Sequence, residues 1–210
     1  MKTIHLFIFS ALILSACSQK TIIPDLATTD DPEKWVLHNR NLIPGEEIFL
    51  DDTINDGLLW LKDFTFANGT IEVDIKGKDV RGMSFVGIAF HGLNDSTYDV
   101  VYFRPFNFES PERHTHAVQY ISHPAYPWYR LRAEHPETYE KPVSPVPDPG
   151  DWFHAKIVVN HPKVEVFVEG AEEPCLEVDQ LNKRKEGWLG FWVGYGSDGS
   201  FRNLKIIPED

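Results

Sequence analysis

The sequence predicts an all-β protein in which two antiparallel sheets form a sandwich. Short segments with strand-like patterns of apolar residues recur along the chain, and glycine and proline separate them at short intervals. No long amphipathic pattern with helical spacing occurs. The chain has 210 residues, which is enough for one large hydrophobic core even after a leader is removed.

Four strands are predicted in the first two thirds of the chain. Residues 70–76 alternate between apolar and polar side chains, which predicts a strand with one buried face. Residues 84–90 are apolar on both faces, as expected of a central strand in a sandwich. Residues 98–104 and 117–122 have strand-like sequences, and we expect them to follow in the same domain.

The C-terminal third predicts two hairpins. Residues 152–159 and 163–168 flank a short, turn-like connection that contains asparagine and proline. Residues 188–195 and 201–207 flank a second connection, which is rich in glycine. Each pair is therefore expected to form neighbouring antiparallel strands.

The segment at about 105–150 differs from the rest of the domain. Apart from the strand at 117–122 it is loop-like and rich in proline. Each proline fixes its own φ and biases the preceding residue toward an extended conformation, so such a loop keeps its shape with few backbone hydrogen bonds. Long ordered loops on a rigid β scaffold often carry binding groups, which indicates this segment as the place of a site.

The N-terminal residues predict a leader. Lys2 supplies a positive charge, and the apolar run from Ile4 to Leu14 is too short to span a bilayer. The following sequence Leu14-Ser15-Ala16-Cys17 resembles a bacterial lipobox, in which the leader is cleaved before a cysteine that carries lipid. We therefore expect a signal peptide at residues 1–16.

The rest of the layout follows from this leader. We expect lipidated Cys17 and a flexible tether at residues 17–33, then a single domain at 34–210. Such a protein is anchored to a membrane of the bacterial cell envelope, outside the cytoplasm, with the membrane and its face left open. Only Cys175 remains after lipidation, so no disulfide can form within the chain, and we expect Cys175 to be a small buried side chain.

The charge of the chain restricts its partners. The formal net charge of -12 argues against nucleic acid and against attraction to anionic lipid headgroups. This charge fits a secreted or surface domain with a neutral substrate.

Histidine, arginine, glutamine and aromatic residues crowd between residues 98 and 152. Aromatic faces stack on the C–H groups of sugars, and these polar side chains bond to hydroxyls, so the mixture predicts a carbohydrate ligand. The expected catalytic residues are Arg104, His116, Gln119 and His123. The expected substrate-binding residues are Asn107, Tyr120, Tyr126, Trp128 and Arg132.

Strand alternation divides these candidates. On an unbroken strand Gln119 and His123 share one face, and His116 and Tyr120 share the other, so only one set can face a concave cleft. Histidine could act as an acid or base near neutral pH, and Arg104 or Arg132 could stabilise negative charge that develops on a substrate oxygen. The alternative is that these histidines bond to loop carbonyls and pack under prolines.

Two stretches carry a family resemblance. Residues 66–74 followed by 84–90 form one, and residues 187–206 form the other, with the pattern G-x-x-G-x-W-x-G and then F-x-N-L-x-I. Both resemble the concanavalin A-like lectin/glucanase jelly rolls and, more narrowly, the bacterial family named for 3-keto-disaccharide hydrolase activity. The resemblance covers roughly residues 35–207 and implies a jelly-roll sandwich.

The resemblance leaves the activity open between three possibilities. One is cleavage of a 3-keto-glycoside by proton abstraction beside the ketone, elimination and hydration. The second is a non-catalytic glycan-binding module of a surface carbohydrate-uptake system, and the third is a structural domain without a sugar ligand. Fold likeness alone does not decide between them.

Two departures from related enzymes narrow the chemistry. Laminarinase-type relatives carry E-x-D-x-x-E on a strand, whereas here Glu72 and Asp74 are followed by Gly77 in place of the second glutamate. Hydrolysis by two carboxylates is therefore disfavoured. Jelly-roll alginate lyases use Gln-x-His, and Gln119 and His123 supply these residue types at a different spacing.

A divalent cation is an open possibility without a committed ligand set. The segment His114-Thr115-His116 could supply two zinc ligands if His91, His123 or Glu109 came near enough to supply a third. Loop oxygens around Asp198 could hold calcium.

Overall fold

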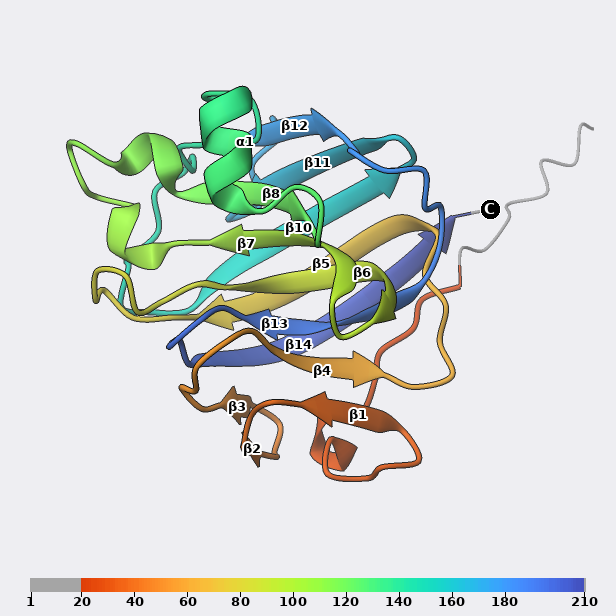
Figure 1. Ribbon diagram of the computed structural model, residues 1–210. Helices are drawn as coiled ribbons and strands as arrows, with labels where there is room; N and C mark the ends of the chain where they lie inside the picture. Colours follow the sequence, from red (N-terminus) through yellow and green to blue (C-terminus); the bar gives the residue numbers. More distant parts are fainter. Residues whose placement is uncertain (1–19, 210) are drawn as a thin grey trace, which may run out of the picture.

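The computed structural model describes residues 20–209, and these form a sandwich of two seven-stranded sheets (Figure 1). The first sheet contains, in spatial order, β1 (Trp35–His38), β4 (Gly57–Leu61), β13 (Trp188–Val193), β6 (Val86–Asn94), β7 (Thr97–Phe103), β8 (Val118–Ser122) and β9 (Glu140–Lys141). The second contains β12 (Leu176–Asp179), β11 (Lys163–Val168), β10 (Phe153–Asn160), β5 (Asn68–Lys76), β14 (Gly199–Glu209), β3 (Ile48–Leu50) and β2 (Leu42–Ile43). All pairings are antiparallel, which confirms the predicted all-β sandwich.

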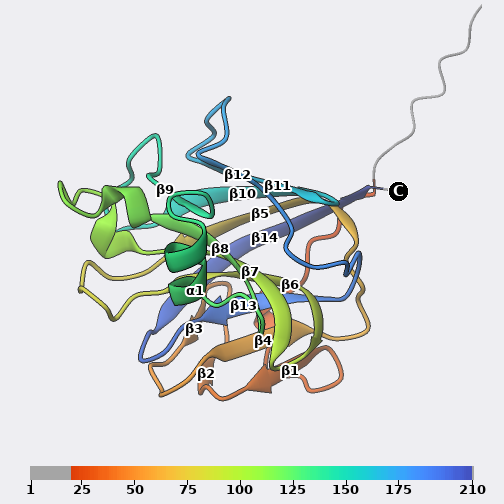
Figure 2. The same cartoon turned by 45° about the horizontal axis from the view of Figure 1, so that its top comes forward.

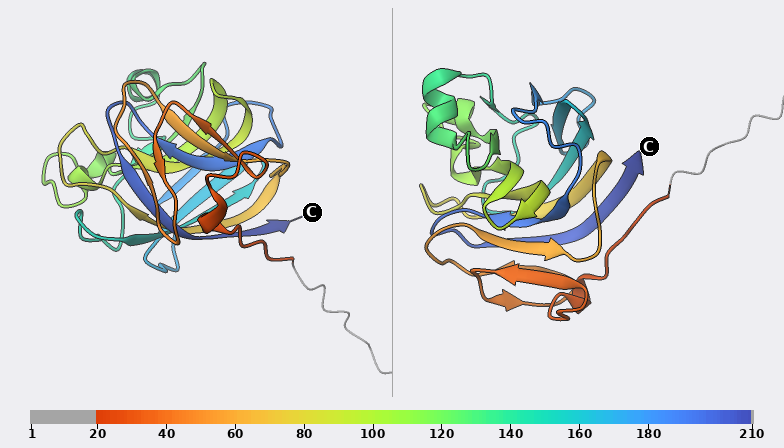
Figure 3. Two further views of the ribbon diagram at one scale, coloured as in Figure 1. Left: turned by 90° about the horizontal axis from the view of Figure 1, so that it is seen from below. Right: turned by 45° about the vertical axis from the view of Figure 1, so that its right-hand side comes forward.

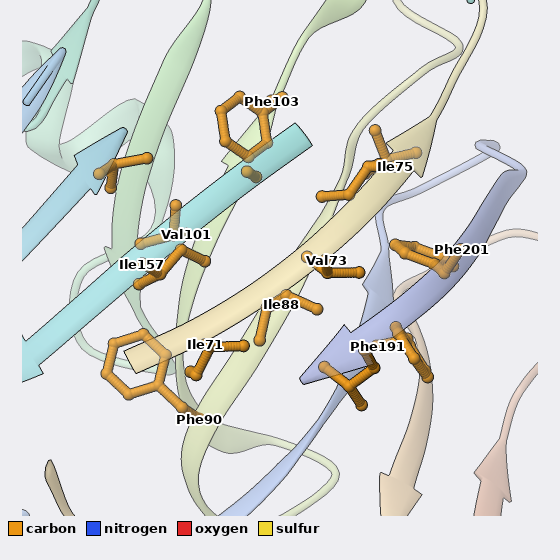
Figure 4. Packing of buried hydrophobic residues seen from close by; sticks show 14 of the residues in the cluster. Ile71, Val73, Ile75, Ile88, Phe90, Val101, Phe103, Ile157, Phe191 and Phe201 are labelled. Carbon is orange, nitrogen blue, oxygen red and sulfur yellow. The ribbon is translucent and has the colours of Figure 1, made fainter. Parts of the chain in front are cut away.

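The hydrophobic core lies between the two sheets. Ile71, Val73 and Ile75 of β5 are fully buried there, as their alternation with polar residues predicts (Figure 4). Phe191 of β13 and Phe201 of β14 meet across the core with ring centroids 4.8 Å apart. Because side chains alternate along each strand, this core also fixes which residues reach the outer faces of the sheets.

Most predicted strands are confirmed, with shifts of a few residues at their ends. The prediction for 84–90 corresponds to β6, which is the middle strand of the first sheet and is buried on both faces over most of its length. The first predicted hairpin is also confirmed, because β10 and β11 pair directly through residues 155–160 and 163–168.

The second predicted hairpin is wrong. β13 pairs with β4 and β6 in the first sheet, whereas β14 pairs with β3 and β5 in the second. The glycine-rich segment 194–198 therefore crosses from one sheet to the other. Both strands turn an apolar face to the core, where Phe191 and Phe201 meet. An apolar face of this kind is expected for two strands in opposite sheets as well as for two neighbouring strands in one sheet.

The proline-rich segment is more ordered than a loop. Besides β8 and β9 it contains the helix α1 (Trp128–Glu134) and two 3-10 turns, Pro105–Asn107 and His114–His116. Pro127 stands at the N-cap of α1, where a missing N–H costs nothing, so proline begins this helix and does not prevent it.

The domain begins earlier than predicted. Ile22 and Ile206 of β14 exchange both backbone hydrogen bonds at 2.8 Å, and Leu26, in a 3-10 turn at Leu26–Thr28, is 7% exposed. Figure 3 shows this segment running beside the end of β14. Part of the segment predicted as a tether is therefore packed on the domain, at Ile22 and at Leu26. Cys17 and the signal peptide lie outside the described residues, and within 20–209 no helix is long and apolar enough to cross a membrane.

A buried polar cluster ties the connection between β12 and β13 to the first sheet. Asp99 is fully buried and accepts hydrogen bonds from Gln180 (2.9 Å), Asn182 (2.7 Å) and Arg184 (2.6 Å). Gln180 also donates to Nδ1 of the fully buried His91 at 2.9 Å. This bonding leaves the proton of the neutral His91 ring on Nε2, which lies 2.7 Å from the carbonyl oxygen of Ala67.

The free energy of unfolding is expected to fall as the pH drops below about 6.5, because burial lowers the pKa of His91 from that ordinary value. Below pH 6.5 the histidine of the unfolded chain takes up a proton, whereas the buried ring of the folded chain stays neutral. The contribution of neutral His91 to the free energy of unfolding is therefore complete above pH 6.5 and is lost as the pH falls toward the lowered pKa of the folded state. Urea titrations at pH values from roughly 7.5 to 5.5 should show that the free energy of unfolding falls less for His91→Gln than for the parent protein. The exposed His135→Gln control should keep the parent slope, and an equal slope in both variants would contradict the assignment.

Candidate functional site

The outer face of the first sheet forms the floor of a cleft. Tyr102 of β7 and Trp192 of β13 point to this face because they alternate with core residues along their strands. Helix α1 and the segments that follow β7 rise at one end of the face (Figure 2).

The larger part of the cleft has a volume of ≈ 410 Å³. Its walls carry four arginines, Arg81, Arg104, Arg113 and Arg132, and four aromatic residues, Phe85, Phe106, Trp128 and Tyr195. His116 and Asn107 complete the polar lining. The volume and the mixture of rings and hydrogen-bonding groups suit a small polar ligand.

A second pocket of ≈ 200 Å³ continues the cleft. Phe85, Trp128 and Tyr195 line both parts, so the two form one elongated depression. The second pocket is mainly apolar and aromatic, and it also contains the acidic side chain of Asp56 and the imidazole of His123.

Glu140 lies beneath the larger part of the cleft and is 2% exposed. Arg132 binds it with two hydrogen bonds, from Nε to Oε1 at 2.7 Å and from Nη2 to Oε2 at 2.6 Å. Arg104 Nη1 lies 3.6 Å from Oε2. His116 Nδ1 lies 3.0 Å from Oε1, at ion-pair distance but without the alignment of a hydrogen bond.

The surroundings keep Glu140 ionised. Burial raises the pKa of Glu140, but the hydrogen bonds from Arg132 and the charges of Arg132, Arg104 and His116 lower it more, so the pKa lies below its ordinary value of 4.5. The result is a fixed negative charge under the cleft.

Arg104 is held in place by the floor of the cleft. Its Nη1 donates to the carbonyl oxygen of His116 at 2.9 Å, and its Nη2 donates to the Tyr102 hydroxyl and to Gln119 Oε1. The guanidinium lies 4.7 Å from the centre of the Tyr102 ring. Burial lowers the pKa of Arg104 and raises that of Tyr102 to about 12, so Tyr102 keeps its proton and donates it to Gln119 Oε1 at 2.8 Å.

His116 ends the 3-10 turn that precedes β8. One ring nitrogen, Nδ1, faces Glu140, and the other, Nε2, makes no hydrogen bond to the described part of the chain. Since His116 lines the cleft, Nε2 is available to a ligand. A histidine with a carboxylate beside one nitrogen is suited to proton transfer with the other.

His123 belongs to the second pocket. Its Nε2 lies 3.6 Å from Asp56 Oδ2, which also accepts a hydrogen bond from the Tyr98 hydroxyl at 2.9 Å. Burial lowers the pKa of His123, although the charges of Asp56 and Asp99 act in the opposite direction. The ring is therefore neutral at neutral pH.

Several residues predicted from the sequence meet at the larger part of the cleft. They are Arg104, Asn107, His116, Trp128 and Arg132. Gln119 is fully buried beneath them, so it positions Arg104 and Tyr102 and does not touch a ligand directly.

Two expected substrate-binding residues lie elsewhere. Tyr120 is fully buried in the core between the sheets, where its ring packs near Phe90 and Tyr139. Tyr126 lines neither part of the cleft and packs under the guanidinium of Arg130. Neither Tyr120 nor Tyr126 is therefore placed to contact a substrate in the cleft.

The division by strand alternation is correct inside β8 and at His123, and it fails before the strand begins. Gln119 faces the cleft side and Tyr120 the core, as alternation requires. His116, however, belongs to a 3-10 turn and not to the strand, so it reaches the same side as Gln119. The two predicted sets are therefore mixed at the site.

The possible cation sites have no complete ligand set within residues 20–209. No three His, Cys, Asp or Glu side chains converge there to hold a metal ion. His114 is exposed and contacts the carbonyl oxygen of Pro111, while the carboxylate of Asp198 forms an ion pair with Lys78.

The acids of the incomplete E-x-D-x-x-E pattern lie away from the cleft. Glu72 and Asp74 are on β5 of the second sheet and alternate with its core residues, so they face outward on the opposite side of the sandwich. Glu72 binds Lys205, and Asp74 binds His154 and Arg202. They take no part in the cleft.

Five residues of the site were not predicted from the sequence: Glu140, Arg81, Arg113, Phe85 and Tyr195. Glu140 stands alone among loop-like residues, and its role depends on burial against Arg132 of α1 and Arg104, which follows β7, and no local pattern encodes this. Arg81 and Tyr195 reach the cleft from connections far apart in the sequence. The only local signal was the density of polar and aromatic residues between 98 and 152.

The sequence matches the family described as "3-keto-alpha-glucoside-1,2-lyase-like domain" over residues 28–207. The chain therefore belongs to this family, as its motifs suggested. No curated protein matches the sequence.

Solved structures share the fold at low sequence identity. The carbohydrate binding module CBM66 from Bacillus subtilis has a TM-score of 0.59 and 15% identity, with 84% of this chain and 97% of that chain covered. The Ca2+-bound VIP36 exoplasmic/lumenal domain has a TM-score of 0.60 and 13% identity, with coverages of 89% and 88%. A structure described as a native glycosidic hydrolase has a TM-score of 0.58 and 11% identity, with coverages of 91% and 97%. These likenesses confirm the jelly-roll fold class, and the chain is a carbohydrate-related domain.

Proposed function

We propose that this domain cleaves a 3-keto-glycoside by elimination, with His116 as the general base. The observation that carries the proposal is the approach of His116 to the ionised, buried Glu140 at the wall of a cleft of sugar size. Membership of the 3-keto-alpha-glucoside-1,2-lyase-like family supports the same chemistry.

The reaction needs one base and no redox partner. The ketone at carbon 3 acidifies the hydrogen on carbon 2, and His116 Nε2 takes this proton while the C–H electron pair forms an enolate. The enolate collapses to re-form the carbonyl, a double bond forms between carbons 1 and 2, and the bond from carbon 1 to the leaving oxygen breaks. Protonated His116 returns its proton to that oxygen. Water then adds its hydroxyl to carbon 1 and its hydrogen to carbon 2, so the net reaction is hydrolysis.

Arg132 is suited to stabilise the enolate oxygen. Its Nε and Nη2 bind Glu140, and its Nη1 makes no hydrogen bond to the described residues. A guanidinium that is already fixed needs no reorganisation when negative charge develops beside it. The ring of Trp128, 5.1 Å from the Arg132 guanidinium, offers an apolar face to the sugar.

A second candidate function is glycan binding without turnover. Its support is the exposed aromatic rim formed by Trp128, Tyr129 and Tyr195, which are 46%, 62% and 63% exposed. Rings held at the rim of a cleft can stack on sugars without any reaction. The names of CBM66 and VIP36 structures with similar folds agree with this reading.

One comparison of substrates separates the two functions. The protein is expected to release the leaving sugar from a 3-keto-disaccharide and to leave the same disaccharide with a hydroxyl at carbon 3 intact, because only the ketone acidifies carbon 2. Chromatography of the products, with and without a chelator, measures this. Saturable binding of the disaccharides without any product would support the binding module and contradict the lyase.

We also propose that the chain is lipid-anchored in the bacterial cell envelope through Cys17, outside the cytoplasm. The support is the lipobox-like sequence Leu14-Ser15-Ala16-Cys17. Cells fed labelled palmitate should incorporate the label into the parent chain and not into the Cys17→Ser variant. Equal labelling of the two chains, or label in neither, would contradict the anchor.

A further inference from the structure

The larger part of the cleft is strongly cationic in a protein that carries a net charge of -12. Its lining contains Arg81, Arg104, Arg113 and Arg132 and no aspartate or glutamate. Glu140, beneath this lining, is the carboxylate that contacts Arg104 and Arg132. Four guanidinium charges against one carboxylate leave a local excess of three positive charges.

Two of these arginines have no counter-charge in the fold. Among residues 20–209, Arg81 and Arg113 form neither an ion pair nor a side-chain hydrogen bond, whereas the more distant Arg130, Arg184 and Arg202 are all paired. Arg81 is exposed and Arg113 is half-buried, and both line the cleft. Gathering like charges without a partner costs stability, which a function can explain.

The amide of Asn107 adds an uncharged hydrogen-bonding group to the same part of the cleft. Asn107 is 3% exposed and donates to the carbonyl oxygen of His116 at 3.0 Å, and its buried Oδ1 has no hydrogen-bond partner among residues 20–209. Since Asn107 lines the cleft, Oδ1 is an acceptor suited to a hydroxyl donor on a ligand. The site therefore offers binding to negative charge and to hydroxyls together.

The second pocket has the opposite character. It is mainly apolar and aromatic, and it contains the acidic side chain of Asp56, which disfavours an anion. The polarity of the cleft thus changes along its length, with the shared rings Phe85, Trp128 and Tyr195 between the two ends.

We propose that the cleft takes an anionic saccharide, with a carboxylate or sulfate group among the arginines and a neutral ring over the aromatic pocket. Guanidinium groups bind planar or tetrahedral oxyanions with paired, charge-assisted hydrogen bonds, and Arg81 and Arg113 are the partners with free capacity. This inference rests on the proposed carbohydrate function and specifies its substrate class. The net charge of -12 of the whole chain indicated a neutral substrate, but the cleft itself carries an excess of positive charge.

Binding of unoxidised disaccharides tests this substrate class without turnover. Calorimetry would compare a neutral disaccharide, the same disaccharide with one uronate, and the same disaccharide with one sulfate. At least one anionic form is expected to bind about tenfold more tightly than the neutral form, with a gap that narrows as salt screens the charges. The tighter of the two anionic forms identifies the oxyanion.

Variants locate the effect. Arg81→Gln combined with Arg113→Gln should bring the anionic disaccharide to the affinity of the neutral one, while Arg130→Gln on the outer side of α1 should leave the preference intact. Thermal melts check that the fold is unchanged, as expected because neither Arg81 nor Arg113 is paired. Neutral and anionic forms of equal affinity would overturn the anionic class and leave the carbohydrate function standing. Absence of binding by all three disaccharides would also overturn the anionic class, and turnover of the 3-keto-disaccharide would then decide whether the carbohydrate function stands.

Discussion

The His116→Ala variant is expected to lose turnover of a 3-keto-disaccharide by about a hundredfold to ten-thousandfold, the usual range for removal of a general base. The fold should stay intact, because His116 lies at the cleft wall and its Nδ1 has no aligned hydrogen bond. The measurement is kcat from initial rates, beside a melting curve. Added imidazole should restore part of the rate in His116→Ala, since it can occupy the vacated space and accept the proton.

The neighbouring His114 supplies a matched control. It lies in the same 3-10 turn but is exposed, and its Nδ1 lies 3.2 Å from the carbonyl oxygen of Pro111. His114→Ala should therefore keep the parent rate within about twofold, well inside the effect of a lost base. Similar rates for His116→Ala and the parent would remove His116 from the mechanism.

The Glu140→Ala variant is expected to lose both stability and turnover. Arg104 is 4% exposed and would keep its charge without the carboxylate, and losing one partner of a buried pair costs about 3 kcal/mol or more. Arg132 would also lose both hydrogen bonds that orient it. Chemical denaturation measures the first effect and product formation the second.

The control for Glu140 is Glu134→Ala on α1. Glu134 forms an exposed ion pair with Arg130, and such pairs contribute about 0–1 kcal/mol.

The contribution of Glu140 to the free energy of unfolding depends on pH, because the pKa of Glu140 in the folded state is below 4.5. This contribution is complete above pH 4.5 and is lost as the pH falls through the pKa of the folded state. If Glu140→Ala unfolds at the same denaturant concentration as Glu134→Ala, Glu140 does not hold the site together.

The fold could largely be predicted because alternation and turn residues are local signals. β5 and β10 show one apolar face in the sequence, and that face is buried in the core. The partner of a strand is not a local signal, which explains the error at β13 and β14. Both strands turn phenylalanines to the core, and the chain between them crosses from one sheet to the other.

The site was predictable in its residue types and not in its geometry. Arg104, His116 and Arg132 were identified from chemical composition alone, and they do meet. The carboxylate that organises them, Glu140, was missed because its importance comes from burial beside Arg104, Arg132 and His116, which depends on the whole fold. Tyr120 was misplaced because an aromatic residue beside polar ones can equally well face the core.

The central claim is that His116 removes the proton from carbon 2 of a 3-keto-glycoside, and exchange in heavy water tests it most directly. The reaction would be run in D₂O and the released 3-keto-sugar analysed at early times by NMR, with enzyme-free buffer and His116→Ala as controls for spontaneous exchange. Proton abstraction followed by hydration predicts deuterium on carbon 2 of the product, at a rate that requires His116. A product formed at full rate with its original hydrogen on carbon 2 would contradict the account.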